Sequence, residues 1–226
     1  MRTPLIALLA TLPLFAHAGD YVLRGVSKQF DLTVHPRFAC KDASDVESPC
    51  IGPATLSFKP HGGRVIPALR VDTLKLDVDD RGVARTNDAT MYGEQSMLIA
   101  GDFNFDGHDD LALRTGDDGS YGGPTYDVFV FDARSGRFVE DGALGSLTQE
   151  TLGMFEVDAK RHRIGTWAKS GCCWHEYVEY TNGAKGLVAV YRRTEDATRD
   201  PMTITEERLD AHGRWHTRRH REPVKG

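Results

Sequence analysis

The segment Met97-Leu-Ile-Ala-Gly-Asp-Phe-Asn-Phe-Asp-Gly-His-Asp-Asp-Leu-Ala-Leu113 places a polar loop between two short apolar runs. The runs, residues 97–100 and 111–113, are too short for helices and are typical of strands. The segment therefore predicts a strand–loop–strand unit. It is the first indication that the chain is built from short strands and turns.

Oxygen-bearing side chains recur at alternate positions of this loop and then once more at its end: Asp102, Asn104, Asp106 and Asp110. A loop of this kind can curl around a calcium ion, which takes about six to eight oxygen ligands. Gly107 would permit the sharp turn, and His108 would contribute its backbone carbonyl rather than its ring. The sequence thus predicts one structural Ca²⁺ ion. The alternative, a solvated Asp/Asn/Gly-rich turn, remains open.

The loop differs from an EF-hand, which would carry a bidentate glutamate where this chain has Leu113. No histidine or cysteine cluster has the spacing of a zinc site. A hydrolytic metal centre is therefore not expected.

Residues 1–18 are predicted to be an export signal. Arg2 precedes an apolar run from Pro4 to Ala16, and Ala16-His-Ala18 is a small–x–small cleavage site. The run is shorter than the roughly 20 apolar residues that a membrane-spanning helix needs. We therefore expect a mature chain of residues 19–226 that is periplasmic, or secreted, and has no membrane span.

The formal net charge is −5, and −6 without residues 1–18, which weakly disfavours nucleic acid as a partner. The segment from Arg214 to Arg221 is basic by contrast. These arginines either line the solvent face of a last strand, where charge discourages sheet-to-sheet association, or form a patch for an acidic partner or polymer.

Four cysteines in an exported chain are expected to form disulfides. Cys40 and Cys50 bracket a polar loop, which favours a local bridge. Cys172 and Cys173 are adjacent and would then form a vicinal disulfide. The alternative is that each of these two reaches back to Cys40 or Cys50.

Apolar residues alternate with polar ones along most of the chain, which predicts an all-β fold: an antiparallel sandwich or a small propeller-like arrangement of short hairpins. Hairpin turns are expected at residues 132–136, at Asn182-Gly183 and at residues 211–213. One short helix is expected near residues 144–152. We predict an N-terminal β subdomain over residues 19–70, carrying the Cys40–Cys50 loop, and a main β domain over residues 71–226, carrying the calcium loop.

Two further loops are candidates for binding. The first, residues 116–126, holds four glycines, one proline and Tyr121, which would suit an aromatic interface anchor. An ordinary glycine-rich connection is the alternative. The second, residues 169–175, contains the adjacent cysteines and Trp174, which could contact a partner. The alternative is that this turn caps the core with Trp174 buried. His175 and Glu176 would point to opposite faces of a strand, and no nucleophile–base–orienter set is visible, so we expect no enzyme activity.

Four strings occur in one order: residues 98–111, 121–128, 152–158 and 169–175. Together they resemble the bacterial exported family that includes the immunity protein of a type IV secretion killing system. The loop at 102–110 is similar to those of FG-GAP repeats. That immunity protein neutralises a lysozyme-like effector, and its structure is similar to the periplasmic inhibitors of peptidoglycan hydrolases.

In such inhibitors a loop with Ser, Gly and Tyr enters the hydrolase cleft and meets its catalytic acid. The resemblance therefore implies partner-binding roles for Ser120, Tyr121, Ser170 and Trp174. In the first loop the glycine precedes the serine, and in the second Trp174 replaces the tyrosine.

The function expected from these features is an exported calcium-binding β protein that binds and inhibits a peptidoglycan hydrolase, in an immunity or lysozyme-inhibitor role. The alternative is a calcium-stabilised surface or adhesion module that binds glycan or protein. The sequence assigns neither the target hydrolase nor the oligomeric state.

Overall fold

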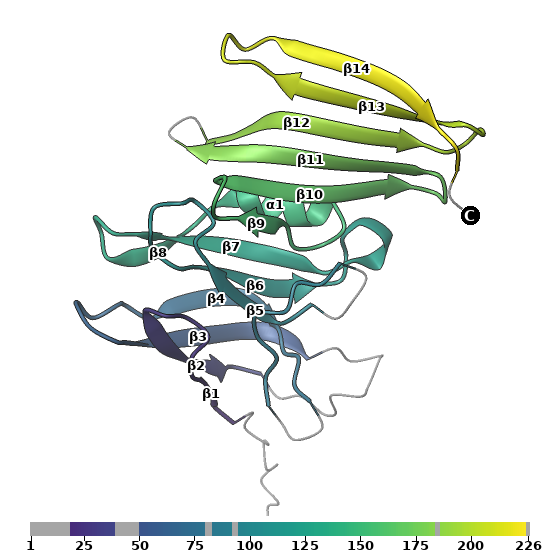
Figure 1. The fold of residues 1–226 in the computed structure, drawn as a ribbon. Helices are drawn as coiled ribbons and strands as arrows, with labels where there is room; N and C mark the ends of the chain where they lie inside the picture. The colour runs from purple at the N-terminus through teal and green to yellow at the C-terminus, as the bar shows by residue number, and fades with distance from the viewer. Residues whose placement is uncertain (1–18, 39–49, 80–82, 92–94, 184–185, 225–226) are drawn as a thin grey trace, which may run out of the picture.

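The structure is a computed structural model that describes residues 19–38, 50–79, 83–91, 95–183 and 186–224. Within these ranges the chain forms three antiparallel sheets, one α-helix and no closed barrel (Figure 1). The prediction of an all-β, sandwich-like fold is confirmed. The predicted export signal lies outside the described residues.

The elements divide into three groups along the chain. The first sheet contains β1 (Tyr21–Leu23), β2 (Phe30–Pro36), β3 (Ile51–Pro60) and β4 (Leu69–Lys75), in that order. The second sheet contains β5 (Leu98–Gly101), β6 (Asp110–Gly116), β7 (Thr125–Asp132) and β8 (Arg137–Glu140). The third sheet has the order β14 (Trp215–Glu222), β13 (Met202–Leu209), β12 (Gly186–Asp196), β11 (Trp174–Gly183), β10 (Arg163–Ser170) and β9 (Glu156–Asp158). A 3₁₀ turn, η1 (Ser120–Gly122), precedes β7, and α1 (Gly142–Glu150) follows β8.

The first two sheets share one apolar core. On β2, every second residue is buried, as the period-two pattern predicts. Leu32 and Val34 of this strand belong to the same cluster as Leu111 and Leu113 of β6. Phe30 and Phe138 add an edge-to-face ring pair with centroids 5.8 Å apart. The two sheets are therefore the layers of a sandwich.

The opposite face of the second sheet packs on α1 and on the base of the third sheet. Tyr126 and Val128 of β7 join Leu144 of α1 and Ile164 of β10 in a second cluster of buried residues. The carboxylate of Asp141 caps α1 by accepting hydrogen bonds from the first-turn N–H groups of Ala143 and Leu144. The helix expected near residues 144–152 is confirmed, with its start at Gly142. No helix in the described ranges has the length and apolar character to cross a bilayer.

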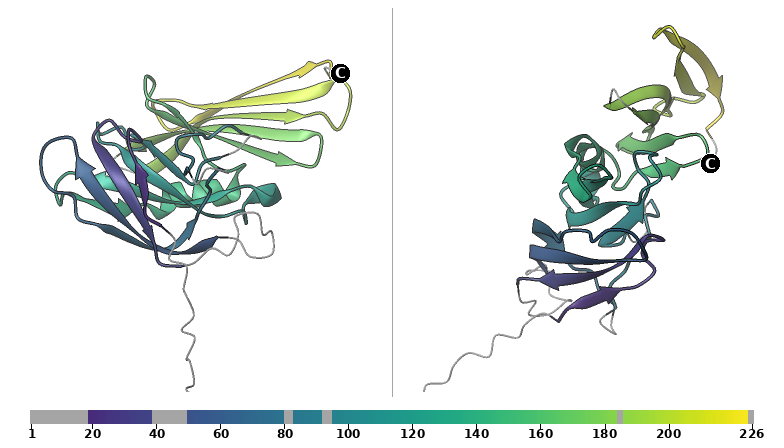
Figure 2. Two further views of the ribbon diagram at one scale, coloured as in Figure 1. Left: turned by 90° about the horizontal axis from the view of Figure 1, so that it is seen from below. Right: turned by 90° about the vertical axis from the view of Figure 1, so that its left-hand side faces the viewer.

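The third sheet extends from this body, and β12–β14 project away from the sandwich (Figures 1 and 2). Val178 on β11 and Ile204 on β13 are buried. Among the described residues, β12 and β14 contribute no buried apolar side chain. The outer strands therefore form a single layer with two polar faces.

Two predicted boundaries differ from the structure. The division between residues 19–70 and 71–226 falls inside β4, which pairs with β3 along its length and shares the sandwich core. The hairpin expected at Asn182-Gly183 is confirmed between β11 and β12, but its turn is displaced, because both residues remain in β11, opposite Leu187 and Gly186 of β12. Local turn chemistry was outweighed by continued strand pairing. The turns at 132–136 and 211–213 are confirmed.

Candidate functional site

The acidic loop at residues 102–110 joins β5 to β6 and is closed by its own side chains. The Asp102 carboxylate accepts hydrogen bonds from the N–H groups of Asp106 (3.0 Å) and Gly107 (2.9 Å). Asn104 Oδ1 also accepts from Asp106 N–H, and Asp106 Oδ1 accepts from His108 N–H. These hydrogen bonds hold the loop in the curled conformation that the alternating pattern predicts.

Asp110, the last of the predicted calcium ligands, is fully buried. Its carboxylate accepts hydrogen bonds from Phe103 N–H (2.8 Å) and Phe131 N–H (2.9 Å). The pKa of this carboxyl is raised to about 7, chiefly by burial and to a smaller extent by the negative charge of Asp106. Asp110 thus fixes the loop to β7 from inside the protein.

The oxygen donors fit calcium by type, because carboxylate, amide and carbonyl oxygens are its usual ligands. However, no three His, Cys, Asp or Glu side chains in the described ranges converge in a ready-made metal site. The loop carboxylates are directed to backbone N–H groups instead. Calcium binding at Asp102, Asn104, Asp106, His108 and Asp110 stays a prediction, and it would require these side chains to turn toward the ion.

The acidic loop is also tied to the first sheet, which the sequence did not indicate. Gln29 Nε2 donates to the carbonyl of Gly107 (2.8 Å), and Ser27 Oγ donates to Asp109 Oδ2 (2.6 Å). The ring of His108 lies against Phe131, with ring centroids 5.3 Å apart. The loop is therefore held between the two layers of the sandwich.

The two loops proposed for binding meet in the structure. We call residues 116–124 the Tyr121 loop and residues 169–175 the disulfide hairpin. The backbone N–H of Gly171 donates a hydrogen bond of 2.6 Å to Tyr121 Oη. The ammonium group of Lys169 lies 4.5 Å from the centroid of the Tyr121 ring, within the range of a cation–π contact. Two segments that are far apart in sequence thus form one composite surface.

Tyr121 is presented outward on this surface. It lies in η1 with φ +59° and ψ +29°, a left-handed conformation that is uncommon for a residue with a side chain. Its side chain is 61% exposed. The residue is thus largely open to solvent apart from its contacts with Gly171 and Lys169.

The two candidate serines differ in availability. Ser120 Oγ donates to the carbonyl of Glu150 at the end of α1 (3.1 Å), so its proton is already engaged. Ser170 is exposed at the end of β10. It pairs across the hairpin with Trp174, which is half-buried and faces Asp196 on the next strand. Ser170 is the more accessible hydroxyl of the two.

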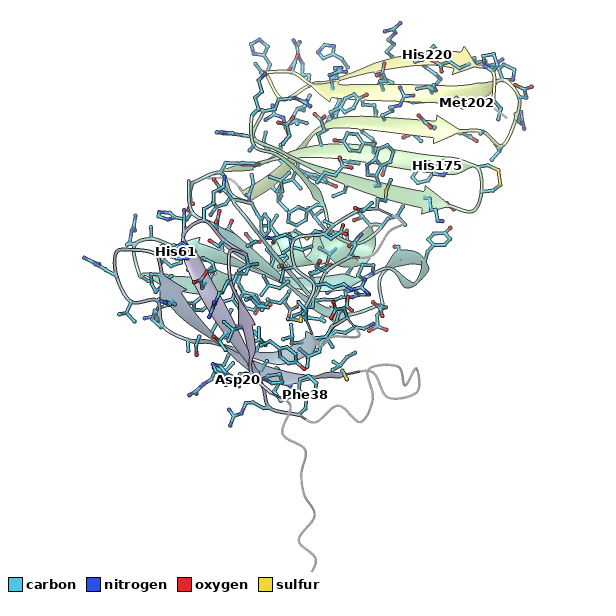
Figure 3. The ribbon with its side chains drawn as sticks, turned by 60° about the horizontal axis from the view of Figure 1, so that its bottom comes forward. Asp20, Phe38, His61, His175, Met202 and His220 are labelled. Carbon is cyan, nitrogen blue, oxygen red and sulfur yellow. A yellow bond between two sulfur atoms is a disulfide. The ribbon has the colours of Figure 1, made fainter. Side chains whose placement is uncertain are left out.

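The disulfide hairpin carries a bond between Cys172 and Cys173, as the local pairing predicts. Figure 3 shows it as a yellow bond at the end of the hairpin. The carbonyl of Cys173 accepts a hydrogen bond from Ala197 N–H (2.7 Å), which joins the hairpin to the end of β12. Cys50 is disulfide-bonded, whereas Cys40 lies outside the described residues.

Sequence reasoning missed two groups of the composite surface, Lys169 and the N–H of Gly171. Nothing in the local pattern of residues 169–175 specifies that Tyr121 is their neighbour. His175 and Glu176 lie on opposite faces of β11, as expected from strand geometry. Glu176 is 3.2 Å from Arg192 on β12, and burial raises the pKa of its carboxyl.

No family model and no curated protein matches this chain. Among solved structures, the chain is similar to a Xanthomonas type IV secretion system related protein, with 26% sequence identity and a TM-score of 0.67. The similarity covers 96% of this chain and 98% of that chain. It therefore extends over all three sheets and agrees with an association with type IV secretion.

Proposed function

We propose that this protein is an exported inhibitor that binds a lysozyme-like peptidoglycan hydrolase through the composite surface of the Tyr121 loop and the disulfide hairpin. The similarity to a type IV secretion system related protein supports this setting. The periplasm, after removal of residues 1–18, is where such a hydrolase would be met. Binding, rather than chemistry on a substrate, is the role of the surface.

The hydrogen bond from Gly171 N–H to Tyr121 Oη carries the proposal. A phenol has acceptor lone pairs and a single O–H donor. Because Gly171 occupies an acceptor position, the phenolic proton is free to be donated to a partner. The catalytic acid or base of a glycoside hydrolase is a carboxyl group in a cleft, which is an acceptor of the required kind.

Lys169 adds positive charge beside this donor. Its ammonium group, 4.5 Å from the Tyr121 ring centroid, favours an approaching carboxylate. The exposed aromatic ring can fill a sugar-binding subsite of the same cleft, since aromatic residues are frequent interface anchors. Ser170 supplies a second hydroxyl, and half-buried Trp174 supports the hairpin from the adjoining strand.

In this proposal a calcium ion has a structural role. Asp102, Asn104, Asp106 and Asp110, with the His108 carbonyl, would hold it, and it would neutralise the acidic loop between β5 and β6. The Tyr121 loop follows β6 directly. Calcium would therefore stiffen the strand that precedes the binding surface.

Inhibition of a panel of lysozyme-like muramidases by the purified protein tests the proposal. Tyr121→Phe keeps the ring and removes the donor, so the inhibition constant should rise about tenfold, the value of a hydrogen bond to a charged group. Tyr121→Ala should raise it further, to about a hundredfold, because the aromatic anchor is also lost. Tyr21→Phe, on half-buried Tyr21 of β1, is the matched control.

Absence of inhibition across the panel would refute the hydrolase-inhibitor role. Binding to peptidoglycan fragments or to another surface protein, without inhibition, would favour the calcium-stabilised adhesion module. Inhibition that is equally strong with Tyr121→Ala would place the inhibitory surface elsewhere on the molecule.

A further inference from the structure

The strand β14 forms one edge of the third sheet and remains open to pairing. It pairs with β13 over the whole span from Trp215 to Glu222 without a register shift. Natural edges are usually blunted by a bulge, a proline, a very short strand or charged side chains. The first three devices do not interrupt β14, so an unbroken row of backbone N–H and C=O groups lies along its outer side. Its arginines disfavour pairing with another basic strand, but they favour an acidic one.

Arginines project from both faces of this edge. Arg218 pairs with Glu206 of β13, whereas Arg219 and Arg221 pair with Thr205 and Thr203. Because successive residues of a strand alternate in direction, Arg218 lies on one face and the other two on the opposite face. All three are exposed (Figure 3 shows the row of side chains around His220).

The acidic residues of β13 offset the charge of these arginines only in part. Glu206 accepts a hydrogen bond from Tyr191 Oη (2.9 Å), and Glu207 lies 3.2 Å from Arg192. In the part of the chain that the structure describes, none of the three arginines lies within ion-pair distance of a carboxylate. Arg219 donates only to Thr205 Oγ1, at 3.3 Å. Arg218 faces Glu206 on β13 and helps to lower the pKa of that carboxyl, whereas Arg219 and Arg221 face threonines. The edge therefore carries an excess of positive charge, most of it on the face of Arg219 and Arg221.

The hairpin that presents this edge has a well-braced turn. The Asp210 carboxylate accepts hydrogen bonds from His212 N–H (2.8 Å) and Arg214 N–H (2.9 Å). It also lies 2.8 Å from His216 Nε2. These bonds fix β14 against β13, so a partner would meet an edge that is already in strand conformation.

The chemistry of the edge selects among possible occupants. A second copy would pair β14 antiparallel with itself, and a central register would place Arg218 opposite Arg218 or Arg219, which is repulsive. A membrane or another flat anionic surface would contact only one face, leaving Arg218 or the Arg219–Arg221 pair unused. A partner strand that pairs with β14 lies in the plane of the sheet, so its side chains can reach the arginines on both faces.

We propose that β14 is a docking edge for an extended acidic segment of another protein, which adds to the third sheet as a further strand and places carboxylates beside Arg218, Arg219 and Arg221. Hydrogen bonds between the two backbones would hold the segment along β14, and the arginines would make the edge selective for a negatively charged segment. This surface is separated from the disulfide hairpin by β12 and β13. The docking role proposed for β14 goes beyond the proposed inhibition of a hydrolase and does not depend on that inhibition.

The test uses three fluorescently labelled peptides and the full-length mature chain, measured by anisotropy at low and at physiological ionic strength. The first peptide is Thr-Glu-Glu-Val-Glu-Glu-Thr-Val, with blocked ends. The second replaces every Glu by Gln, and the third replaces the central Val by Pro. We expect the first peptide to bind, and both others to bind at least about tenfold more weakly.

The triple variant Arg218→Gln/Arg219→Gln/Arg221→Gln should weaken binding of the first peptide about tenfold. The control variant Arg24→Gln/Arg64→Gln/Arg70→Gln changes the net charge equally, on exposed arginines of the first sheet and its loops, and should leave binding unchanged. Circular dichroism would verify that both variants are folded.

Several results would overturn the proposal. Lack of binding by the first peptide would do so directly. Equal binding of the proline peptide would reduce the edge to a non-specific polyanion surface. Binding of phosphatidylglycerol vesicles without peptide binding would identify a membrane as the occupant, and a β14-dependent dimer in sedimentation would identify a second copy.

Discussion

The sandwich formed by the first two sheets and the outer half of the third sheet are stabilised in different ways. In the sandwich, buried side chains from both layers meet in one apolar cluster. In β12–β14, polar groups link neighbouring strands on both faces, with Ile204 as the one buried apolar side chain among their described residues. Burial of apolar area contributes far more per residue than exposed polar pairs do. The sandwich is therefore held together mainly by its apolar core, whereas the outer strands depend on contacts between polar groups.

The polar ladder of the outer strands is continuous. Arg192 lies 3.2 Å from both Glu176 on β11 and Glu207 on β13, so three strands are joined on one face. On the other face, Arg208 lies 4.3 Å from the centroid of the Tyr191 ring. Such a ladder fixes strand register while leaving both faces hydrated.

The largest expected effect is in the sandwich core. Leu111→Ala should lower the free energy of unfolding by about 3 kcal/mol, because it removes a fully buried side chain and leaves a cavity. Val65→Ala, at a side chain that is 85% exposed, should change it by less than about 0.5 kcal/mol. Urea denaturation of both variants measures the difference. Equal effects would show that the shared core is not the source of stability.

Calcium should stabilise the sandwich next most strongly. Saturating Ca²⁺ is expected to raise the melting temperature by about 5 °C or more, since a ligand that binds only the folded state shifts the equilibrium toward it. Asp106→Ala should abolish the shift, whereas Asp72→Ala, on β4, should retain it. Differential scanning calorimetry with calcium and with chelator gives the result. A melting curve indifferent to both would argue against the metal.

The polar ladder should contribute little to global stability. Glu207→Gln is expected to lower the free energy of unfolding by about 0.5 kcal/mol, because partly exposed ion pairs are weak. Hydrogen exchange should nevertheless accelerate in β12 and β13, while the amides of β6 and β7 remain protected. Glu150→Gln, at the exposed end of α1, is the control. A loss comparable to that of Leu111→Ala would contradict the contrast between the two regions.

The smallest effect concerns the β13–β14 turn and is a pH effect. The hydrogen bond with His216, together with the backbone N–H groups of Arg214 and His212, lowers the pKa of Asp210 to about 2 from an ordinary 3.8. A carboxyl with a lowered pKa stabilises the folded form above pH 3.8, and this contribution is lost as the pH falls toward 2.

Protection of the β14 amides should therefore decline between about pH 4 and pH 2 in NMR exchange experiments, before the sandwich unfolds. Asp210→Asn should remove this pH dependence. If the β14 amides of the variant and the parent protein respond identically, Asp210 does not brace the turn.

Much of the fold was predictable from local pattern. The alternation of apolar and polar residues identified the chain as all-β, because side chains of a strand point to alternate sides. The acidic loop was recognised from residues 102–110 alone, since the hydrogen bonds that curl it join residues only two to five positions apart. The misplaced turn at Asn182-Gly183 shows the limit, because pairing across the sheet outweighed the turn preference of two residues.

The sequence by itself determined which segments are strands, where most turns fall, and which loops carry unusual chemistry. It could do so because these properties depend on neighbours within a few residues along the chain. Only the tertiary structure decided that Gly171 donates to Tyr121, that Gln29 and Ser27 hold the acidic loop, and that the arginines of β14 line an open edge. These contacts join segments tens of residues apart, and they are set by the packing and order of the sheets rather than by any local pattern.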